Sequence, residues 1–143
     1  KQRRGELERQ PGHVIDIMAT CTDVGGVKFP NKFAETEIIP LEGVSLKPTF
    51  SGKKLQRDDA IYFEHHLNCA IRDGDWKLVR KGQTGRNSKL FAWELYNMSN
   101  DRAELHDLAK QHPEKVQQLA GRWEAWAVRA KVKPWPYKIA EDE

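Results

Sequence analysis

The sequence predicts an α+β fold, in which a small antiparallel sheet of about four strands carries a long C-terminal helix on one face and follows one earlier helix. Two patterns support this prediction. Residues 60–80 alternate apolar and polar side chains around a glycine-containing turn, as antiparallel strands do. Residues 113–130 repeat apolar side chains at helical spacing. With 143 residues, 38% of them hydrophobic, the chain can bury one modest core.

Residues 60–80 predict two or three strands joined by tight turns. The dipeptide Asp73-Gly74 is expected to supply the positive φ angles of a two-residue hairpin turn. Successive side chains of the preceding strand point to opposite faces, so one histidine shares a face with large apolar residues and the next shares a face with a carboxylate. Residues 93–98 predict a further strand. The two faces of the first strand are Ile61, Phe63 and His65, and Tyr62, Glu64 and His66.

The last predicted element is a helix that starts at His112-Pro113-Glu114, where proline and a carboxylate suit the first turn. One narrow apolar stripe is expected to pack on the sheet, with Trp126 at its edge. Pro134-Trp135-Pro136 is expected to stop the helix and leave a poorly ordered tail. The stripe consists of Val116, Leu119, Ala120, Trp123, Ala127 and Ala130, while Glu114, Gln118, Arg122 and Arg129 are expected to face away.

An amphipathic helix is predicted near the N-terminus and is expected to end at Gly25-Gly26. Asp16 and Asp23 lie opposite its apolar stripe, about 10 Å apart along the axis, which favours a solvated or interface face over a metal pair. Residues 28–55 predict a long loop with one helical turn at 45–51, which wraps another part of the protein. The stripe comprises Val14, Ile17, Met18, Cys21 and Val24.

Composition excludes several classes of protein. The net charge of +3 and the pI near 8.9 do not demand a nucleic-acid partner, and they suit an anionic small substrate. No apolar run approaches the roughly 20 residues of a membrane helix, and the basic N-terminus lacks the apolar part of a secretory signal. Cys21 and Cys69 predict buried free thiols, with a bridge between them as the alternative.

One group of polar side chains stands next to aromatic residues, namely Glu64, His65, His66 and Asn68. A histidine at a strand end can bind an anionic oxygen or move a proton near neutral pH. The alternative is a structural histidine paired with its neighbouring carboxylate. The sequence contains no serine nucleophile elbow, CxxC, HExxH or glycine-rich dinucleotide motif. Residues 81–89 predict a flexible basic loop.

Five blocks, in order, resemble the C-terminal portion of bacterial type I sulfatases, the arylsulfatase A-like family. They cover roughly residues 5–136 and include PLEGVSL at 40–46, AIYFEHHLNCAIRDGDWKLV at 60–79 and WELYNMSNDRAELHDLA at 93–109. The family strand block commonly reads W-E-H-x-G-N-R-A-[VI]-R-x-G-x-W-K-L, and the later block reads close to ELYDLxxDPxExxNLA. The departures are Phe63, Leu67, Cys69, Arg102, Asp107 and Ala19.

The resemblance implies a missing N-terminal catalytic domain that holds a calcium ion and a formylglycine made from cysteine in a Cys-x-Pro-Ser-Arg context. Neither Cys21 nor Cys69 has that context, so the chain alone is expected to be non-catalytic and to hold no metal or cofactor. Residues 1–27 are then expected to be the last helix of the catalytic domain, residues 28–58 a wrapping loop, and residues 59–143 the C-terminal sheet-and-helix subdomain.

The expected function is that of a non-catalytic end of a sulfatase, which borders the cleft for a sulfated aryl or carbohydrate substrate through Glu64, His65, His66 and Asn68. A stand-alone module that binds anionic glycans through Lys81, Arg86 and Lys89 is the alternative, and a nucleic-acid scaffold is the third. Periplasmic or secreted localisation is expected if the missing N-terminus carries a signal peptide. Exposed Val14, Ile17 and Met18 are expected to let the isolated chain dimerise.

Overall fold

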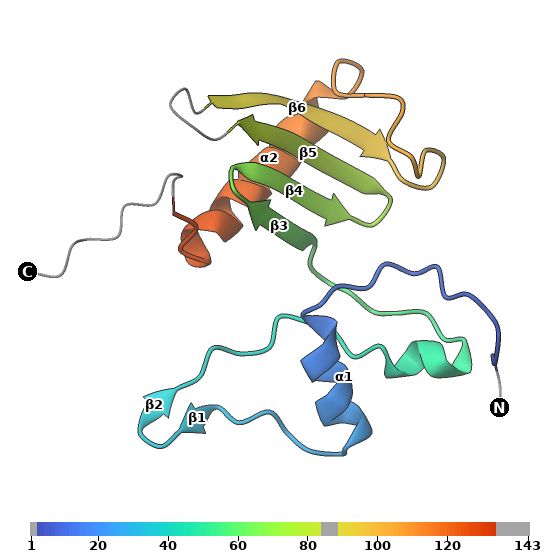
Figure 1. The fold of residues 1–143 in the computed structure, drawn as a ribbon, viewed down its shortest axis with the longest axis vertical. Helices are drawn as coiled ribbons and strands as arrows, with labels where there is room; N and C mark the ends of the chain where they lie inside the picture. The colour runs from blue at the N-terminus through green and yellow to red at the C-terminus, as the bar shows by residue number, and fades with distance from the viewer. Residues whose placement is uncertain (1–2, 84–88, 134–143) are drawn as a thin grey trace, which may run out of the picture. The chain divides into compact units, whose positions relative to one another are not determined.

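The computed structural model describes residues 3–83 and 89–133 (Figure 1). Contacts divide the chain into two compact units, Lys1–Asp58 and Asp59–Glu143. Unit 1 holds α1 (Asp16–Val24), β1 (Lys32–Phe33), β2 (Thr36–Glu37) and the short 3-10 helix η1 (Lys47–Ser51). Unit 2 holds β3 (Ile61–His65), β4 (Asn68–Asp73), β5 (Trp76–Gln83), β6 (Lys89–Asn97) and α2 (Pro113–Arg129).

Unit 2 confirms the predicted α+β fold. Its four strands pair antiparallel in the order β3-β4-β5-β6, and α2 crosses one face of this sheet (Figure 1). Each strand follows its predecessor through a short connection, so neighbours in sequence are neighbours in the sheet. No helix within the described residues is long and apolar enough to cross a membrane.

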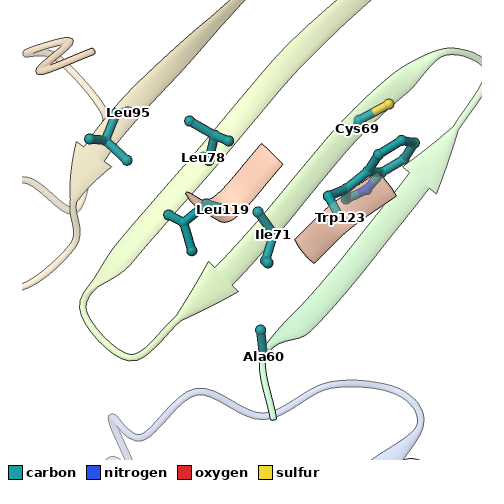
Figure 2. Packing of buried hydrophobic residues seen from close by; sticks show 7 residues of the cluster. All are labelled: Ala60, Cys69, Ile71, Leu78, Leu95, Leu119 and Trp123. Atoms are coloured by element: carbon teal, nitrogen blue, oxygen red, sulfur yellow. The ribbon is translucent and has the colours of Figure 1, made fainter. Parts of the chain in front are cut away.

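The sheet register sorts the side chains onto two faces. Tyr62 pairs with Ile71, Ile71 with Leu78 and Leu78 with Leu95, and this row lies under α2. Figure 2 shows Leu119 of α2 beside Ile71 and Leu78. Because strand side chains alternate, Ile61, Phe63 and His65 lie on the other face. The face with Tyr62 and Glu64 is therefore the one that α2 covers.

The turn between β4 and β5 differs from its prediction by one residue. Asp73 pairs with Trp76, which makes Gly74 and Asp75 the two central residues. Gly74 has a φ of 57°, whereas Asp73 is the last residue of β4. The prediction that Asp73-Gly74 supplies the positive φ angles is wrong, because only the first central residue needs a left-handed conformation here.

Helix α2 begins at Pro113 as predicted, and Leu119 and Trp123 are its buried residues. Burial of each contributes about 2 kcal/mol or more. The Trp126 ring stacks on Tyr62 at a centroid distance of 5.1 Å. The helix ends at Arg129, so the predicted stop at Pro134-Trp135-Pro136 and the predicted tail lie outside the described residues.

Two residues of α2 depart from their predicted sides. Ala130 is the exposed C-cap rather than part of the packed stripe. Arg122 was predicted to face away, but its guanidinium donates to Asp73 Oδ2 at 2.5 Å and to Asp59 Oδ1 at 3.2 Å. The long arginine stem lets the charged group reach back to carboxylates at the edge of the sheet.

Unit 1 is held by polar contacts around Asp16. This side chain is 0% exposed, and its carboxylate pairs with Arg57 at 2.5 Å. It also accepts the amide hydrogens of His13 and Val44 at 2.8 and 2.9 Å. The prediction of a solvated or interface face is therefore wrong for Asp16. Asp23 forms a surface ion pair with Lys47.

The apolar stripe predicted for α1 is largely exposed. Ile17 is 58% exposed and Met18 is 51% exposed. Cys21 is exposed as well, so its prediction as a buried thiol is wrong, whereas Cys69 is buried, and both are free. In unit 1, the buried side of α1 is formed by Asp16 and Ala19 instead.

The long loop of unit 1 contains more structure than the sequence predicted. Lys47–Ser51 forms the predicted helical turn as η1. Strands β1 and β2 form a two-stranded ladder that was not predicted, because two residues per strand are too few to show an alternation.

Candidate functional site

The predicted site residues lie at the hairpin that joins β3 to β4. His65 pairs with Asn68, so His66 and Leu67 are the two central residues of the turn. Their φ angles are 49° and 71°. Two positive φ angles match the twist of a hairpin but usually call for asparagine or glycine. The turn therefore holds two bulky residues in a conformation that costs each about 1 kcal/mol or more.

Asn68 fastens this turn. Its Nδ2 donates to the carbonyl oxygens of His65 and His66 at 3.0 and 3.3 Å. Its Oδ1 accepts the amide hydrogen of Gly82, in β5, at 3.2 Å. Glu64 adds a hydrogen bond, since its Oε1 accepts the Leu67 amide hydrogen at 3.3 Å. The side chains of Asn68 and Glu64 therefore stabilise the backbone of the turn.

Gly82 makes room for the turn. A β-carbon at this position would overlap the Cβ, the carbonyl carbon and the carbonyl oxygen of Leu67. The family pattern has glycine at position 67, and this chain places a leucine there. Gly82 thus accommodates the close approach of the turn, a role that no sequence motif revealed.

The hairpin also carries two neighbouring imidazole rings, those of His65 and His66. Their rings lie 4.1 Å apart between centroids, with an interplanar angle of 24°. Glu64, His65, His66 and Asn68 are all exposed. An exposed imidazole pair can bind an anion or exchange a proton with solvent. The position of these residues at the rim of a substrate cleft stays a prediction.

On the α2 side of the same hairpin, Cys69 lies beside an arginine held by aromatic rings. The Arg80 guanidinium is 4.3 Å from the Trp93 ring centroid and 5.7 Å from that of Trp123. Its Nη2 donates to Cys69 Sγ at 3.8 Å. Burial raises the pKa of the Cys69 thiol, and Arg80 offsets only part of that rise. The thiol is therefore a packing group and a poor nucleophile.

Metal ligands are not gathered in the described ranges. No group of three or more histidine, cysteine, aspartate or glutamate side chains within residues 3–83 and 89–133 could hold a metal ion. The sequence also lacks Cys-x-Pro-Ser-Arg, the family context in which a cysteine becomes formylglycine.

The described residues of the predicted basic loop, 81–83 and 89, belong to strands, which corrects the prediction for those positions. Lys81 lies in β5 and Lys89 in β6, while Arg86 lies outside the described residues. The ammonium groups of Lys81 and Lys89 are 5.8 and 4.5 Å from the ring centroid of Phe91. The sequence analysis missed Phe91 because a single phenylalanine beside a basic stretch gives no motif.

Comparison with known proteins confirms the sulfatase resemblance. An uncharacterized sulfatase of Schizosaccharomyces pombe is 32% identical over 113 residues, which cover 77% of this chain and 20% of the yeast protein. No protein-family model matches the chain.

Solved structures share the fold. A Bacteroides thetaiotaomicron protein from the metabolism of multiple glycosaminoglycans, labelled a 6S-sulf, is 24% identical with a TM-score of 0.57, and the match covers 79% of this chain and 24% of that one. A protein solved with its substrate D-glucosamine-2-N,6-O-disulfate is 22% identical with a TM-score of 0.52, covering 81% and 24%. Another, i-CgsB solved with k-i-k-neocarrahexaose, is 21% identical with a TM-score of 0.56, covering 78% and 23%.

The chain is thus similar to a part of sulfatases. It spans 20% of the curated relative and 23–24% of these three solved chains. The four-stranded sheet with its helix is the shared fold.

Proposed function

We propose that this chain is the non-catalytic C-terminal portion of a sulfatase and borders the substrate cleft of the complete enzyme. The observation that carries this proposal is the match of 77–81% of the chain to only 20–24% of sulfatase-like proteins. Sulfuric ester hydrolysis then depends on a catalytic domain that supplies the formylglycine and the calcium ion.

The absence of a Cys-x-Pro-Ser-Arg motif from this chain supports the assignment of sulfate ester hydrolysis to another domain. Cys21 is followed by Thr-Asp-Val and Cys69 by Ala-Ile-Arg, so neither can become formylglycine in the family context. Cys69 is also buried, and its raised pKa disfavours the thiolate.

Exposed apolar side chains on α1 and just before it support the proposal that unit 1 contacts a partner. Val14, Ile17 and Met18 are 69%, 58% and 51% exposed, and exposed apolar clusters commonly mark interaction sites. We propose the catalytic domain as that partner. In the isolated chain, the same residues would let two copies associate.

The β3–β4 hairpin is the part proposed to reach the cleft. Asn68 and Gly82 fix its backbone, so the exposed rings of His65 and His66 are presented on a rigid turn. Imidazole groups of this kind can donate hydrogen bonds to sulfate or sugar oxygens. We assign them a binding role and no step in bond cleavage.

The test uses the complete sulfatase that contains this chain, with sulfated oligosaccharide as substrate. His65→Ala is expected to raise KM about threefold to tenfold with kcat unchanged, because it removes binding shared by ground and transition states. His106→Ala is the control, since His106 is exposed and pairs with Asp101 in the same unit. A His65→Ala enzyme with the KM of the control would refute the cleft-border role.

A further inference from the structure

Two lysines and a phenylalanine form a cluster at the end of the β5–β6 ribbon. The Lys81 and Lys89 ammonium groups both lie within 6 Å of the Phe91 ring centroid. The Phe91 side chain is 40% exposed, and both lysines are exposed. Solvent therefore reaches two cations and one aromatic surface at the same place.

A bulge in the strand pairing creates this arrangement. Arg80 pairs with Trp93, but Gly82 pairs with Leu90, so Lys81 faces two residues of β6 in place of one. Bulges turn side chains away from a regular ladder. The first four residues of β6 are all exposed, Leu90 at 47% and Phe91 at 40%, so this end of the ribbon lies outside the buried core.

Among the described residues, no carboxylate neutralises the two ammonium groups of the cluster by an ion pair. Within the described residues, neither Lys81 nor Lys89 has a carboxylate at ion-pair distance. An anion near the two ammonium groups gains a favourable Coulomb interaction with each of them. The cluster lies at the same end of the sheet as the β3–β4 turn, because Gly82 donates to Asn68.

We propose that Lys81, Lys89 and Phe91 bind the anionic part of a sulfated saccharide. The ammonium groups pair with sulfate oxygens, and the exposed ring packs against the C–H face of a sugar. An aromatic platform beside cations favours a sulfated sugar over an inorganic anion, since the ion offers no apolar face. This inference rests on the proposed sulfatase function, and it names the substrate class and three contact residues.

Binding is measured by titration of the 143-residue chain with a heparin-derived sulfated hexasaccharide, at about 50 mM salt and again at about 300 mM. The variant K81Q/K89Q is expected to weaken binding about fivefold to tenfold, as two exposed ion pairs would. F91A is expected to weaken it about threefold at both salt concentrations, because contact with an uncharged face is not screened. The matched control K53Q/K54Q removes the same charge from exposed lysines of unit 1 and should change Kd less than twofold.

Specificity is tested with the desulfated hexasaccharide and with a single-stranded DNA of equal charge. The wild-type chain should bind the sulfated sugar more tightly than either. The inference is overturned if the chain does not bind the sulfated hexasaccharide, if K81Q/K89Q behaves as K53Q/K54Q does, or if DNA binds equally well and F91A has no effect. Because these titrations need no turnover, their failure is separate from a failure of the sulfatase assignment.

Discussion

The buried ion pair of unit 1 gives the sharpest stability prediction. Asp16 is 0% exposed and Arg57 is 14% exposed, and the Asp16 carboxylate also accepts two amide hydrogens. Breaking a buried ion pair by removing one partner costs about 3–5 kcal/mol, since the other charge stays buried and unpaired. Asp16→Asn keeps the shape of the side chain but removes its charge.

The expected result is local unfolding of α1, a helix of nine residues. A helix this short is marginal without tertiary contacts, so the loss should lower amide protection in residues 16–25 about a hundredfold or more. Hydrogen exchange, corrected for intrinsic rates, measures this for each residue. Asp23→Asn is the matched control on the same helix. Its ion pair with Lys47 is exposed (42% and 51%) and screened by solvent, so its loss should leave the amide protection of α1 nearly unchanged.

The stability of α1 is expected to depend on pH, and the direction of that dependence follows from the pKa of Asp16. Burial alone would raise the pKa of Asp16, but the hydrogen bonds from Arg57, Val44 and His13 outweigh it and hold the pKa below its ordinary value. A carboxylate with a depressed folded-state pKa stabilises the fold above its unfolded pKa, near 3.9, and this contribution is lost as the pH falls through the folded pKa. Protection of α1 should therefore decline below about pH 4 in the wild type and not in Asp16→Asn. Equal effects of Asp16→Asn and Asp23→Asn would refute the reasoning.

Two further predictions concern unit 2. Gly82→Ala should destabilise the sheet by more than about 2 kcal/mol, because the new methyl group overlaps Leu67. Urea unfolding measures the change in the free energy of unfolding. A change below about 0.5 kcal/mol would contradict the close approach of Gly82 to Leu67. Trp123→Phe removes the 3.0 Å hydrogen bond that Trp123 Nε1 donates to the carbonyl oxygen of Phe63. The unpaired acceptor and the lost side-chain volume should lower the free energy of unfolding by about 1–3 kcal/mol. A urea unfolding midpoint equal to that of the wild type would count against this contact.

The sheet could be predicted because its information is local. Strand alternation in residues 60–80 and the helical stripe around Leu119 and Trp123 each repeat over many residues. The exact turn could not be fixed, since Asp73-Gly74 and Gly74-Asp75 are both acceptable hairpin dipeptides, and only the pairing of Asp73 with Trp76 decides between them.

Unit 1 shows where periodicity misleads. The apolar stripe of α1 predicted a buried side, but Ile17 is exposed and Asp16 is buried. The partners of Asp16 include Val44 and Arg57, which lie 28 and 41 residues away in the sequence. A pattern within one helix cannot reveal contacts at that separation.

The candidate site was found only in part. Glu64, His65, His66 and Asn68 do lie together, as their proximity in sequence required. The assignment of Asn68 and Glu64 to hydrogen bonds of the turn could not be predicted, because it depends on the left-handed φ angles of the turn and on the approach of β5. Phe91 was missed for a similar reason, since its approach to Lys81 depends on the pairing of β5 with β6.

Release of sulfate from an aryl sulfate ester, with calcium present, tests the central claim most directly. The complete sulfatase that contains this chain is predicted to turn the ester over, while the purified 143-residue chain is predicted to release no sulfate above the uncatalysed rate. The reason is that the chain carries no Cys-x-Pro-Ser-Arg sequence from which the nucleophile could form. Sulfate release by the purified chain above the uncatalysed rate would contradict the account.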